Sequence, residues 1–303
     1  MSRTPRADKR YLVWVGAETD LIFSKGIDLP GFASFPLLET SDGRDLLTEY
    51  ARAQIALAEK YGFGCILESA TWIANQDRAA PLGYDQSALE KANRDAVALL
   101  CNLRDETPGS DILISANIGP RSDAYTPQSL MSPEEAAAYH GLQITSLRGS
   151  TPDLISGYTL SNVPEAIGIV QAASKAEFEC VISFTVETDG TLPTGETLDA
   201  AIYQTDIATD ATARYYMINC AHPDHFSSVL NGNPRLGGIV VNASRCSHAE
   251  LDEATTLDDG NPDELGSQVA RMAAAYPSMR VVGGCCGTDM RHLEAMAKSI
   301  RNA

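Results

Sequence analysis

Eight short apolar runs alternate with amphipathic helical patterns along almost all of this 303-residue chain. Most of the runs are rich in β-branched residues and show no strict alternation of polar and apolar side chains. That pattern is typical of parallel strands that are buried on both faces. The runs cover Tyr11–Gly16, Gly64–Leu67, Ile112–Ala116, Leu154–Ser156, Val181–Thr185, Arg214–Asn219, Gly238–Asn242 and Arg280–Gly284. The helical patterns between them cover Leu46–Lys60, Gln86–Leu103, Pro133–Leu147, Val163–Lys175, Leu198–Thr209, Pro262–Ala275 and Met290–Ile300.

Strands and helices that alternate in this way are the sequence outline of a (β/α)8 barrel, an α/β fold. No linker, internal repeat or low-complexity tract divides the chain, so we predict one TIM-barrel domain over residues 1–303. A doubly wound open sheet is the alternative. Its Gly-rich phosphate-binding turn is missing after the first run, where VGAETD stands. The longest irregular stretch, Asp20 to Asp42, is expected to be the first strand-to-helix loop, and such loops carry function in barrels.

The chain is acidic, with 23 Lys and Arg against 40 Asp and Glu and a formal net charge of −17. A surface of that sign repels nucleic acid and anionic membranes, so we expect neither as a partner. No apolar run approaches the roughly 20 residues of a membrane-spanning helix. The basic start MSRTPRADKR is not followed by the apolar segment of a signal peptide. We therefore expect a cytoplasmic protein.

The seven cysteines do not indicate a disulfide framework in such a chain. Cys65, Cys101 and Cys180 lie inside apolar stretches and are expected to be small core residues. Two others, Cys285 and Cys286, are adjacent, in the segment GGCCGTD that follows the last apolar run. Neighbouring cysteines cannot close a relaxed disulfide with each other. We therefore interpret this pair as two ligands of one metal ion.

A third thiol, Cys220, directly follows the sixth apolar run in the segment MINCAHPDH. The strand-to-helix turns of a barrel all open on one face, so Cys220, Cys285 and Cys286 should meet at its C-terminal mouth. Three thiolates suit Zn²⁺, which prefers four soft or borderline ligands and keeps one position open where it is catalytic. The glycines around the adjacent pair give the backbone the freedom to aim both side chains at one ion.

These residues resemble the homocysteine S-methyltransferase family, which includes betaine–homocysteine and S-methylmethionine–homocysteine methyltransferases. The most specific element is Cys220 after Asn219, together with GGCCGTD. The resemblance extends over nearly the whole chain and implies a zinc (β/α)8 barrel whose three cysteines match Cys220, Cys285 and Cys286. Other segments follow the family order: IGP at 118–120 with His140, the 153–166 segment, SFT at 183–185 with Thr194-Gly195, and NAS at 242–244.

The chemistry of such a site is methyl transfer to sulfur, with Cys220, Cys285 and Cys286 as the expected catalytic and metal-binding residues. A thiol bound at the fourth zinc position would lose its proton and remain strongly nucleophilic. Its sulfur would attack the methyl group of a cationic donor, a sulfonium or quaternary ammonium compound. We expect homocysteine as the default acceptor, giving methionine. The expected partners are these small molecules, and a homo-oligomer stays open because members of the family differ.

Two positions depart from the family pattern. The family has an acid after the first strand, where this chain has Trp14, and a Glu after the fourth strand, where it has Tyr158. In the family those acids hold the amino group of homocysteine, and without them the ion pairs to an ammonium are lost. Either other acids near strand ends compensate, or the thiol acceptor or the methyl donor differs. The candidate compensating acids are Glu18, Glu68 and Glu187.

In the second case an aromatic surface would hold the methylated cation. Trp14, Trp72 and Tyr158 are the candidates, since aromatic faces attract desolvated onium groups by roughly 1–2 kcal/mol. Asn117 and Asn242, at the C-terminal ends of their strands, are further candidate substrate contacts, or equally residues that tie down the turns. A catalytically silent barrel that stores zinc or binds a ligand is the alternative from a different class.

Several other residues near these segments have more than one interpretation. Cys246 lies one strand from the expected zinc site and is expected to be a loop thiol, with a substitute ligand as the alternative. His222 and His225 have the i, i+3 spacing of helical metal ligands. Three thiols already suffice for the metal, so we expect helix-start or loop roles for both. His140 is expected to be a hydrogen-bonded interior residue.

Overall fold

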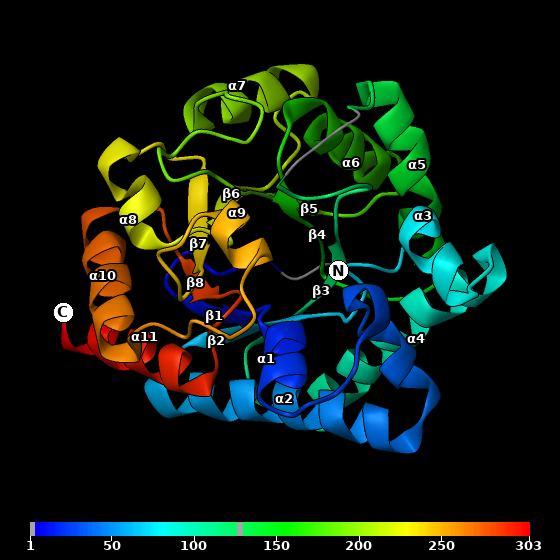
Figure 1. The fold of residues 1–303 in the computed structure, drawn as a ribbon, viewed down its shortest axis with the longest axis horizontal. Helices are drawn as coiled ribbons and strands as arrows, with labels where there is room; N and C mark the ends of the chain where they lie inside the picture. The colour runs from blue at the N-terminus through cyan, green and yellow to red at the C-terminus, as the bar shows by residue number, and fades with distance from the viewer. Residues whose placement is uncertain (1–3, 126–129) are drawn as a thin grey trace.

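Eight parallel strands form one closed barrel in the computed structural model, which describes residues 4–125 and 130–303. Each strand pairs with its neighbours in chain order, and β8 closes on β1 (Figure 1). The predicted TIM-barrel fold is therefore confirmed. The strands are β1 (Tyr11–Trp14), β2 (Gly64–Glu68), β3 (Ile112–Ile118), β4 (Leu154–Leu160), β5 (Cys180–Phe184), β6 (Tyr216–Asn219), β7 (Leu236–Val241) and β8 (Val281–Gly284).

Helices surround the barrel between successive strands (Figure 1). The long ones are α2 (Ser41–Tyr61), α4 (Gln86–Asp105), α5 (Pro133–Ser146), α6 (Val163–Lys175), α7 (Leu198–Ala208), α10 (Pro262–Ala275) and α11 (Met290–Asn302). Shorter ones are α1 (Ala17–Phe23), α3 (Gln76–Ala79), α8 (Pro223–Phe226) and α9 (His248–Asp252). None of the helices in the described part of the chain has the length and apolar character that crossing a bilayer requires.

The first strand-to-helix connection differs from expectation. The stretch from Asp20 to Asp42, predicted to be irregular, is partly helical. Helix α1 ends at Phe23, 3₁₀ turns follow at Pro30–Phe32 and Phe35–Glu39, and α2 begins at Ser41. The physical reason is that α1 has only 7 residues and no side-chain cap at its start. Its sequence therefore carries neither a periodic pattern nor a start signal.

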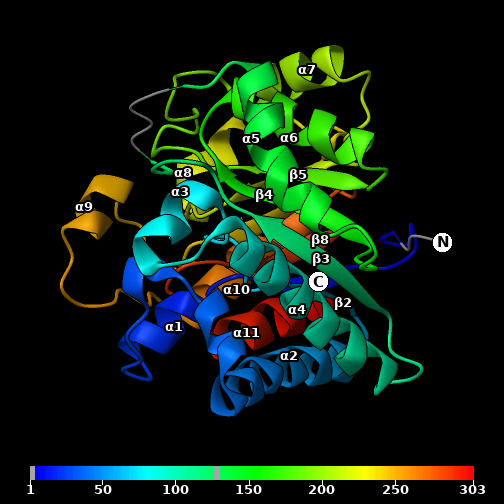
Figure 2. The same ribbon diagram turned by 90° about the vertical axis from the view of Figure 1, so that its right-hand side faces the viewer.

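Helix α9 lies on the mouth side of the barrel. It belongs to the connection between β7 and α10 and crosses in front of the strands in Figure 1. Figure 2 shows α9 and its flanking segments standing out on the side opposite the N-terminus. The connections at the C-terminal ends of the strands thus supply the short elements that cover the mouth.

The interior of the barrel changes from apolar to polar toward this mouth. Side chains alternate between the two faces of a strand, so every second residue faces the interior. One interior layer is apolar and consists of Ile66, Leu113, Leu154, Val181 and Met217. Two positions further along the same strands stand Glu68, Ser115, Ser156, Ser183 and Asn219. Hydrogen bonds join members of this second layer: Ser115 Oγ and Ser156 Oγ are 2.5 Å apart, and Ser183 donates to Asn219 Oδ1 at 2.7 Å.

Helices α5 and α6 pack closely through a glycine. A methyl group added at Gly168 on α6 would lie 2.4 Å from Ala136 Cβ and 2.6 Å from Ala137 N of α5. At Gly141 on α5 the nearest atom to an added methyl group would be Ala172 Cβ, at 4.0 Å. The two glycines thus lie in the same helix pair but differ in the space around them.

We expect Gly168→Ala to destabilise the fold by about 1–2 kcal/mol, because overpacking outweighs the gain in helix propensity. The matched control Gly141→Ala should be neutral or stabilise the fold by up to about 1 kcal/mol. Urea unfolding of both variants and the parent measures the free energies. Equal stability of Gly168→Ala and the parent would contradict this packing.

Candidate metal centre and substrate cavity

Three cysteine sulfurs meet at the mouth of the barrel. Cys220 directly follows β6 and adopts a left-handed backbone with φ of 57°, and Cys285 and Cys286 directly follow β8. Cys220 Sγ lies 2.7 Å from Cys285 Sγ and 3.5 Å from Cys286 Sγ, and the last two sulfurs are 4.0 Å apart. All three are free thiols. The structure therefore brings together the residues that the sequence predicts as one cluster.

The geometry of the three sulfurs fits a tetrahedral metal after one small adjustment. Zinc–sulfur bonds of about 2.3 Å place sulfurs of a tetrahedron about 3.8 Å apart. The distances from Cys286 to its two partners straddle this value, whereas Cys220 and Cys285 would have to separate by about 1 Å. Among the described residues, this is the one group of His, Cys, Asp and Glu side chains close enough to share an ion. Soft sulfur donors favour zinc over harder cations.

Glycines let the end of β8 approach β1. A side chain on Gly283 would put its Cβ 1.8 Å from the carbonyl oxygen of Val13, so only glycine fits there. Gly287, directly after the cysteine pair, has φ of 75°, a conformation that L side chains rarely adopt. These two positions explain why glycines flank the adjacent cysteines.

Tyr125 and His248 contact the cluster from the side of the mouth. The Tyr125 hydroxyl donates to Cys220 Sγ at 3.3 Å, and His248 Nε2 lies 2.9 Å from the carbonyl oxygen of Cys220. The two rings stack with centroids 3.9 Å apart. Without a metal, hydrogen bonds from Cys285 and Cys286 lower the pKa of the Cys220 thiol.

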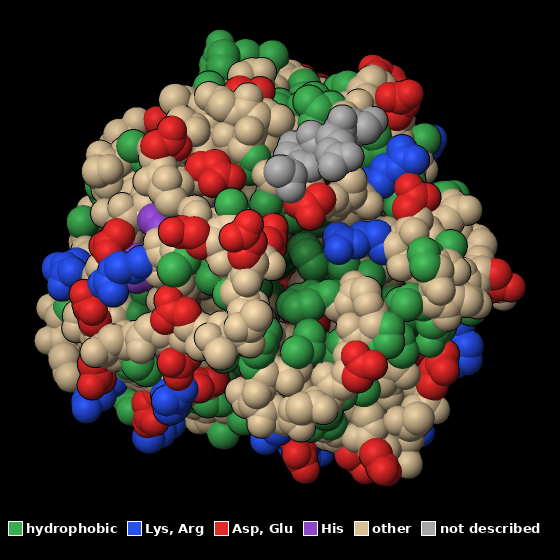
Figure 3. All heavy atoms as spheres, viewed as in Figure 1, with side chains coloured by type: hydrophobic (Ala, Val, Ile, Leu, Met, Phe, Trp, Pro, Cys, Tyr) green, Lys and Arg blue, Asp and Glu red, His purple; other side chains and the backbone are tan. Residues whose placement is uncertain are grey.

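A cavity of about 390 Å³ opens beside the cluster. Figure 3 shows hydrophobic side chains in a hollow at the mouth, with acidic side chains around it. The volume suits one small molecule or two, and the thiols form part of its wall. Its aromatic lining consists of Trp14, Phe23, Phe32, Tyr50, Trp72, Tyr125 and Tyr158.

Trp14 stands at the first of the two positions where the family has an acid. Trp14 lines the cavity, but its indole N–H donates to the carbonyl oxygen and the hydroxyl of Thr288, both at 3.2 Å. Its ring packs on Tyr50, with centroids 5.1 Å apart. The neighbour that packs against the interior cluster with Tyr158 and the thiols is Val15. Trp14 and Val15 therefore place no carboxylate at the end of β1.

Trp72 also lines the cavity. Its indole N–H donates to the carbonyl oxygen of Tyr158 at 3.3 Å, and its ring meets Phe32 edge-on at 6.3 Å between centroids. The guanidinium of Arg78 lies 5.2 Å from the centroid of the Trp72 ring. Arg78 is the single Lys or Arg among the described residues that line the cavity.

The three acids expected near the strand ends have different positions. Glu18 lines the cavity and accepts a hydrogen bond from Ser34 at 2.6 Å, and burial raises the pKa of its carboxyl group. Glu68 lines the cavity too, and its Oε2 is buried without a hydrogen-bond partner. Burial raises the pKa of Glu68 to about 7. Glu187 does not line the cavity; its Oε1 lies 3.4 Å from Nδ1 of His248.

Both candidate asparagines line the cavity. Asn117 is 6% exposed, and its Oδ1 has no hydrogen-bond partner. The Oδ1 of Asn242 accepts from the backbone N–H of Ser244 at 3.0 Å, so this side chain ties down the turn after β7. The turn role expected for one of the two asparagines thus agrees with the contact of Asn242, and a substrate contact of Asn117 stays a prediction.

The remaining sequence candidates lie outside the metal cluster. Cys246 is not one of the clustered thiols. His222 caps the start of α8 by accepting from Asp224 N–H, and His225 Nε2 lies 2.9 Å from the carbonyl oxygen of Arg245. The predicted helix-start and loop roles of both histidines agree with these contacts.

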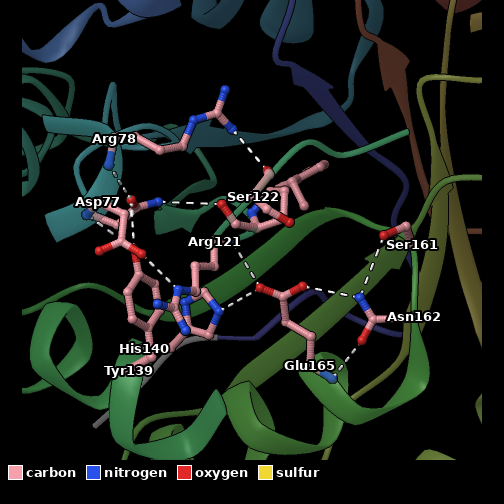
Figure 4. Close-up of polar contacts among 12 residues, drawn as sticks. Asp77, Arg78, Arg121, Ser122, Tyr139, His140, Ser161, Asn162 and Glu165 are labelled. Atoms are coloured by element: carbon pink, nitrogen blue, oxygen red, sulfur yellow. Dashed lines mark hydrogen bonds and ion pairs between the residues drawn. The ribbon is translucent and has the colours of Figure 1, made fainter. Parts of the chain in front are cut away.

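A buried polar network holds the segment that leads to Tyr125. In Figure 4, Glu165 lies between His140 and Asn162. His140 Nε2 is 2.9 Å from Glu165 Oε1, which also accepts from the backbone N–H of Arg121 at 2.8 Å. Arg78 donates to the carbonyl oxygen of Ser122 at 3.3 Å. His140 is thus an interior residue, as expected, and its hydrogen-bonded partner fixes the loop after β3.

Three residues at the mouth have no signal in the sequence: Arg78, Tyr125 and His248. They lie in connections away from the strand ends, outside any motif of recognisable spacing. Only the path of these connections over the mouth brings them to the cavity. The one general indication that such residues belong to the site would be charged and aromatic side chains in the long strand-to-helix connections, since binding residues are common in loops.

The raised pKa of Glu68 predicts a pH-dependent cost to stability. Between about pH 4.5 and 7 the folded protein retains a proton that the unfolded chain has released, so wild-type stability falls as pH rises through this window. We expect Glu68→Gln to match the wild type at pH 5 and to exceed it by roughly 1–3 kcal/mol at pH 8. Urea unfolding at both pH values measures this; the same difference at pH 5 and pH 8 would contradict it.

Solved structures of the homocysteine methyltransferase MmuM from Escherichia coli have the same fold. The oxidised form is 20% identical, with 96% of each chain covered and a TM-score of 0.75. The metallated form is also 20% identical over 96% of each chain, with a TM-score of 0.74. At this level of identity the likeness shows the fold alone.

A family model establishes the relationship at the sequence level. The model described as homocysteine S-methyltransferase matches residues 44–300, which is well over half of the chain. The matched segment includes β2 through β8 and all three clustered cysteines. This chain therefore belongs to the homocysteine S-methyltransferase family and is a methyltransferase.

Proposed function

We propose that this enzyme uses Zn²⁺ held by Cys220, Cys285 and Cys286 to methylate a thiol, with homocysteine as the acceptor and an onium compound as the methyl donor. The observation that carries the proposal is the cluster of three thiol sulfurs in the wall of an aromatic cavity. Three protein sulfurs leave one tetrahedral position for the sulfur of a substrate. A storage site for zinc alone would have no use for the adjoining cavity.

The bound ion would lower the pKa of the acceptor thiol and keep it as a thiolate at neutral pH. The chain contributes orientation and exclusion of water. Asn219 donates toward Cys285 Sγ at 3.9 Å, and Tyr125 donates to Cys220 Sγ, so both sulfurs are held from the protein side. Tyr125 and His248 stack on each other, and His248 also contacts the carbonyl oxygen of Cys220, so the pair helps to fix the position of this ligand.

Methyl transfer needs no proton-transferring residue at the carbon. The acceptor sulfur forms a bond to the methyl carbon while the bond between that carbon and the donor heteroatom breaks. The electron pair leaves with the donor, which becomes neutral, and the acceptor proton has already gone to solvent. Aromatic faces of Phe32, Tyr50 and Trp72 line the space where a cationic donor would lie, and aromatic faces attract onium groups.

If the three clustered cysteines hold the metal, removing one of them should release zinc, whereas removing another cysteine should not. Purified wild-type protein should contain about one zinc per chain, measured by elemental analysis. Cys286→Ala should lose the metal and also lose formation of methionine from homocysteine and S-methylmethionine or betaine, followed by mass spectrometry. The matched control Cys246→Ala removes a thiol of the same face that is outside the cluster and should retain both.

Two outcomes would contradict the proposal. One is full methyl transfer by a preparation from which all metal has been removed. The other is loss of zinc from Cys246→Ala while Cys286→Ala keeps it. A donor panel that includes dimethylsulfoniopropionate and S-adenosylmethionine identifies the donor class, and a mercapto-acid without an amine tests whether another thiol is the true acceptor.

A further inference from the structure

Three buried polar atoms without hydrogen-bond partners lie in one wall of the cavity. They are Glu68 Oε2, Asn117 Oδ1 and Tyr158 Oη, on the adjacent strands β2, β3 and β4. All three residues line the cavity. Asn117 and Tyr158 are 6% and 1% exposed, and Glu68 is half-buried with its Oε2 inaccessible to solvent. Buried polar atoms in folded proteins nearly always have partners, and an unpaired set in a cavity wall indicates a missing ligand.

The polar groups next to these three atoms already have hydrogen-bond partners. Glu68 pairs with Ser115 in the register of β2 and β3, and Ser115 Oγ lies 2.5 Å from Ser156 Oγ of β4. The backbone N–H of Asn117 donates to Ser69 Oγ at 3.0 Å. The strands and hydroxyls below are therefore fixed by their own contacts, and the unpaired oxygens of Glu68 and Asn117 are left for a ligand.

The chemistry of these atoms selects the ligand. An ionised carboxylate and an amide oxygen accept hydrogen bonds and cannot donate them. They need N–H or O–H donors, and the carboxylate in addition needs a positive charge. Arg78, the single Lys or Arg among the described lining residues, stacks on Trp72 and donates to Ser122. Quaternary ammonium and sulfonium groups carry charge but no N–H donor.

We propose that Glu68, with Asn117 and Tyr158, forms a subsite for the primary ammonium group of an amino-acid substrate. The inference rests on the proposed function and deepens it, because it decides between a compensating acid and an acceptor without an amine. The subsite takes the positive charge that the apolar end of β1, at Val15, does not accept.

The position of the subsite relative to the thiols supports this assignment. Tyr158 packs in the same interior cluster as Cys220 and Cys285. The thiols and the three residues of β2, β3 and β4 also line the same cavity, so we infer that one amino acid contacts the metal cluster with its sulfur and this wall with its ammonium. Glu18 is another acid of the cavity lining, but its Oε1 already accepts from Ser34, whereas Glu68 Oε2 has no donor within hydrogen-bond distance.

Binding to the zinc-loaded protein tests the subsite without requiring turnover. Calorimetry would compare homocysteine with 4-mercaptobutanoate, which has the same thiol, chain and carboxylate but no amine. The wild type should bind homocysteine about 10- to 100-fold more tightly, as expected for a charge-assisted hydrogen bond in a buried site. Glu68→Gln should lose this preference while its affinity for 4-mercaptobutanoate stays within about threefold of the wild type.

A second set of binding measurements, the donor arm, uses the methyl donor in place of the thiol and identifies which of the two substrates places its ammonium group at Glu68. It compares S-methylmethionine with its counterpart lacking the amine, in the wild type and in Glu68→Gln. Loss of preference in the thiol arm places the acceptor at Glu68, and loss in the donor arm places the donor there; either result supports the subsite. Glu18→Gln is the matched comparison, because it removes a buried carboxylate from the same cavity.

Three results would overturn the subsite: no preference for the amine in either arm, equal weakening of both ligands by Glu68→Gln, or loss of the preference in Glu18→Gln instead. A protein that prefers the amine but forms no methylated product would refute the proposed function and leave the subsite standing. A protein that methylates both thiols equally well, with no preference in binding, would refute the subsite alone.

Discussion

Closure of the barrel is the constraint on which the rest of this structure depends. Cys220 lies 65 residues before Cys285 in the chain, and the two sulfurs meet because β6 and β8 end on the same face of one closed sheet. Glycine at 283 permits the close contact of β8 with β1 that completes this closure. The metal centre is thus a product of the fold as a whole, and the cavity beside it is formed by the same strand ends and their connections.

The polar layer beneath the mouth shows how binding groups are kept at the expense of stability. Glu68 lies in the barrel interior, two residues beyond the apolar layer on the same strand. Its carboxyl group is buried without a counter-ion. Such a group opposes folding unless it is protonated or paired. Its presence is understandable if a substrate brings the missing charge, since residues that serve a ligand are often unfavourable in its absence.

Much of the fold could be predicted from the sequence, because buried parallel strands and amphipathic helices have distinct periodicities. The range of α6 is predicted to the residue, and the start of α5 is marked by Ser132 and Glu135, which form a capping box. The segment from 17 to 39 could not be predicted, because its helical turns are too short to show a period.

The thiol cluster was predictable because adjacent cysteines flanked by glycines have few other uses. The residues of the cavity wall were harder to predict from the sequence. Glu68 and Glu187 both lie near the end of a strand, and only the course of β2 and β5 shows that Glu68 lines the cavity and Glu187 does not.

X-ray absorption at the zinc edge of the purified enzyme tests whether the three cysteines hold zinc, because it counts the sulfur ligands and measures their distances. We expect three sulfurs at about 2.3 Å in the resting enzyme and a fourth at the same distance once homocysteine is added. A zinc ion bound mainly by nitrogen and oxygen, or a sulfur count that homocysteine leaves unchanged, would contradict it.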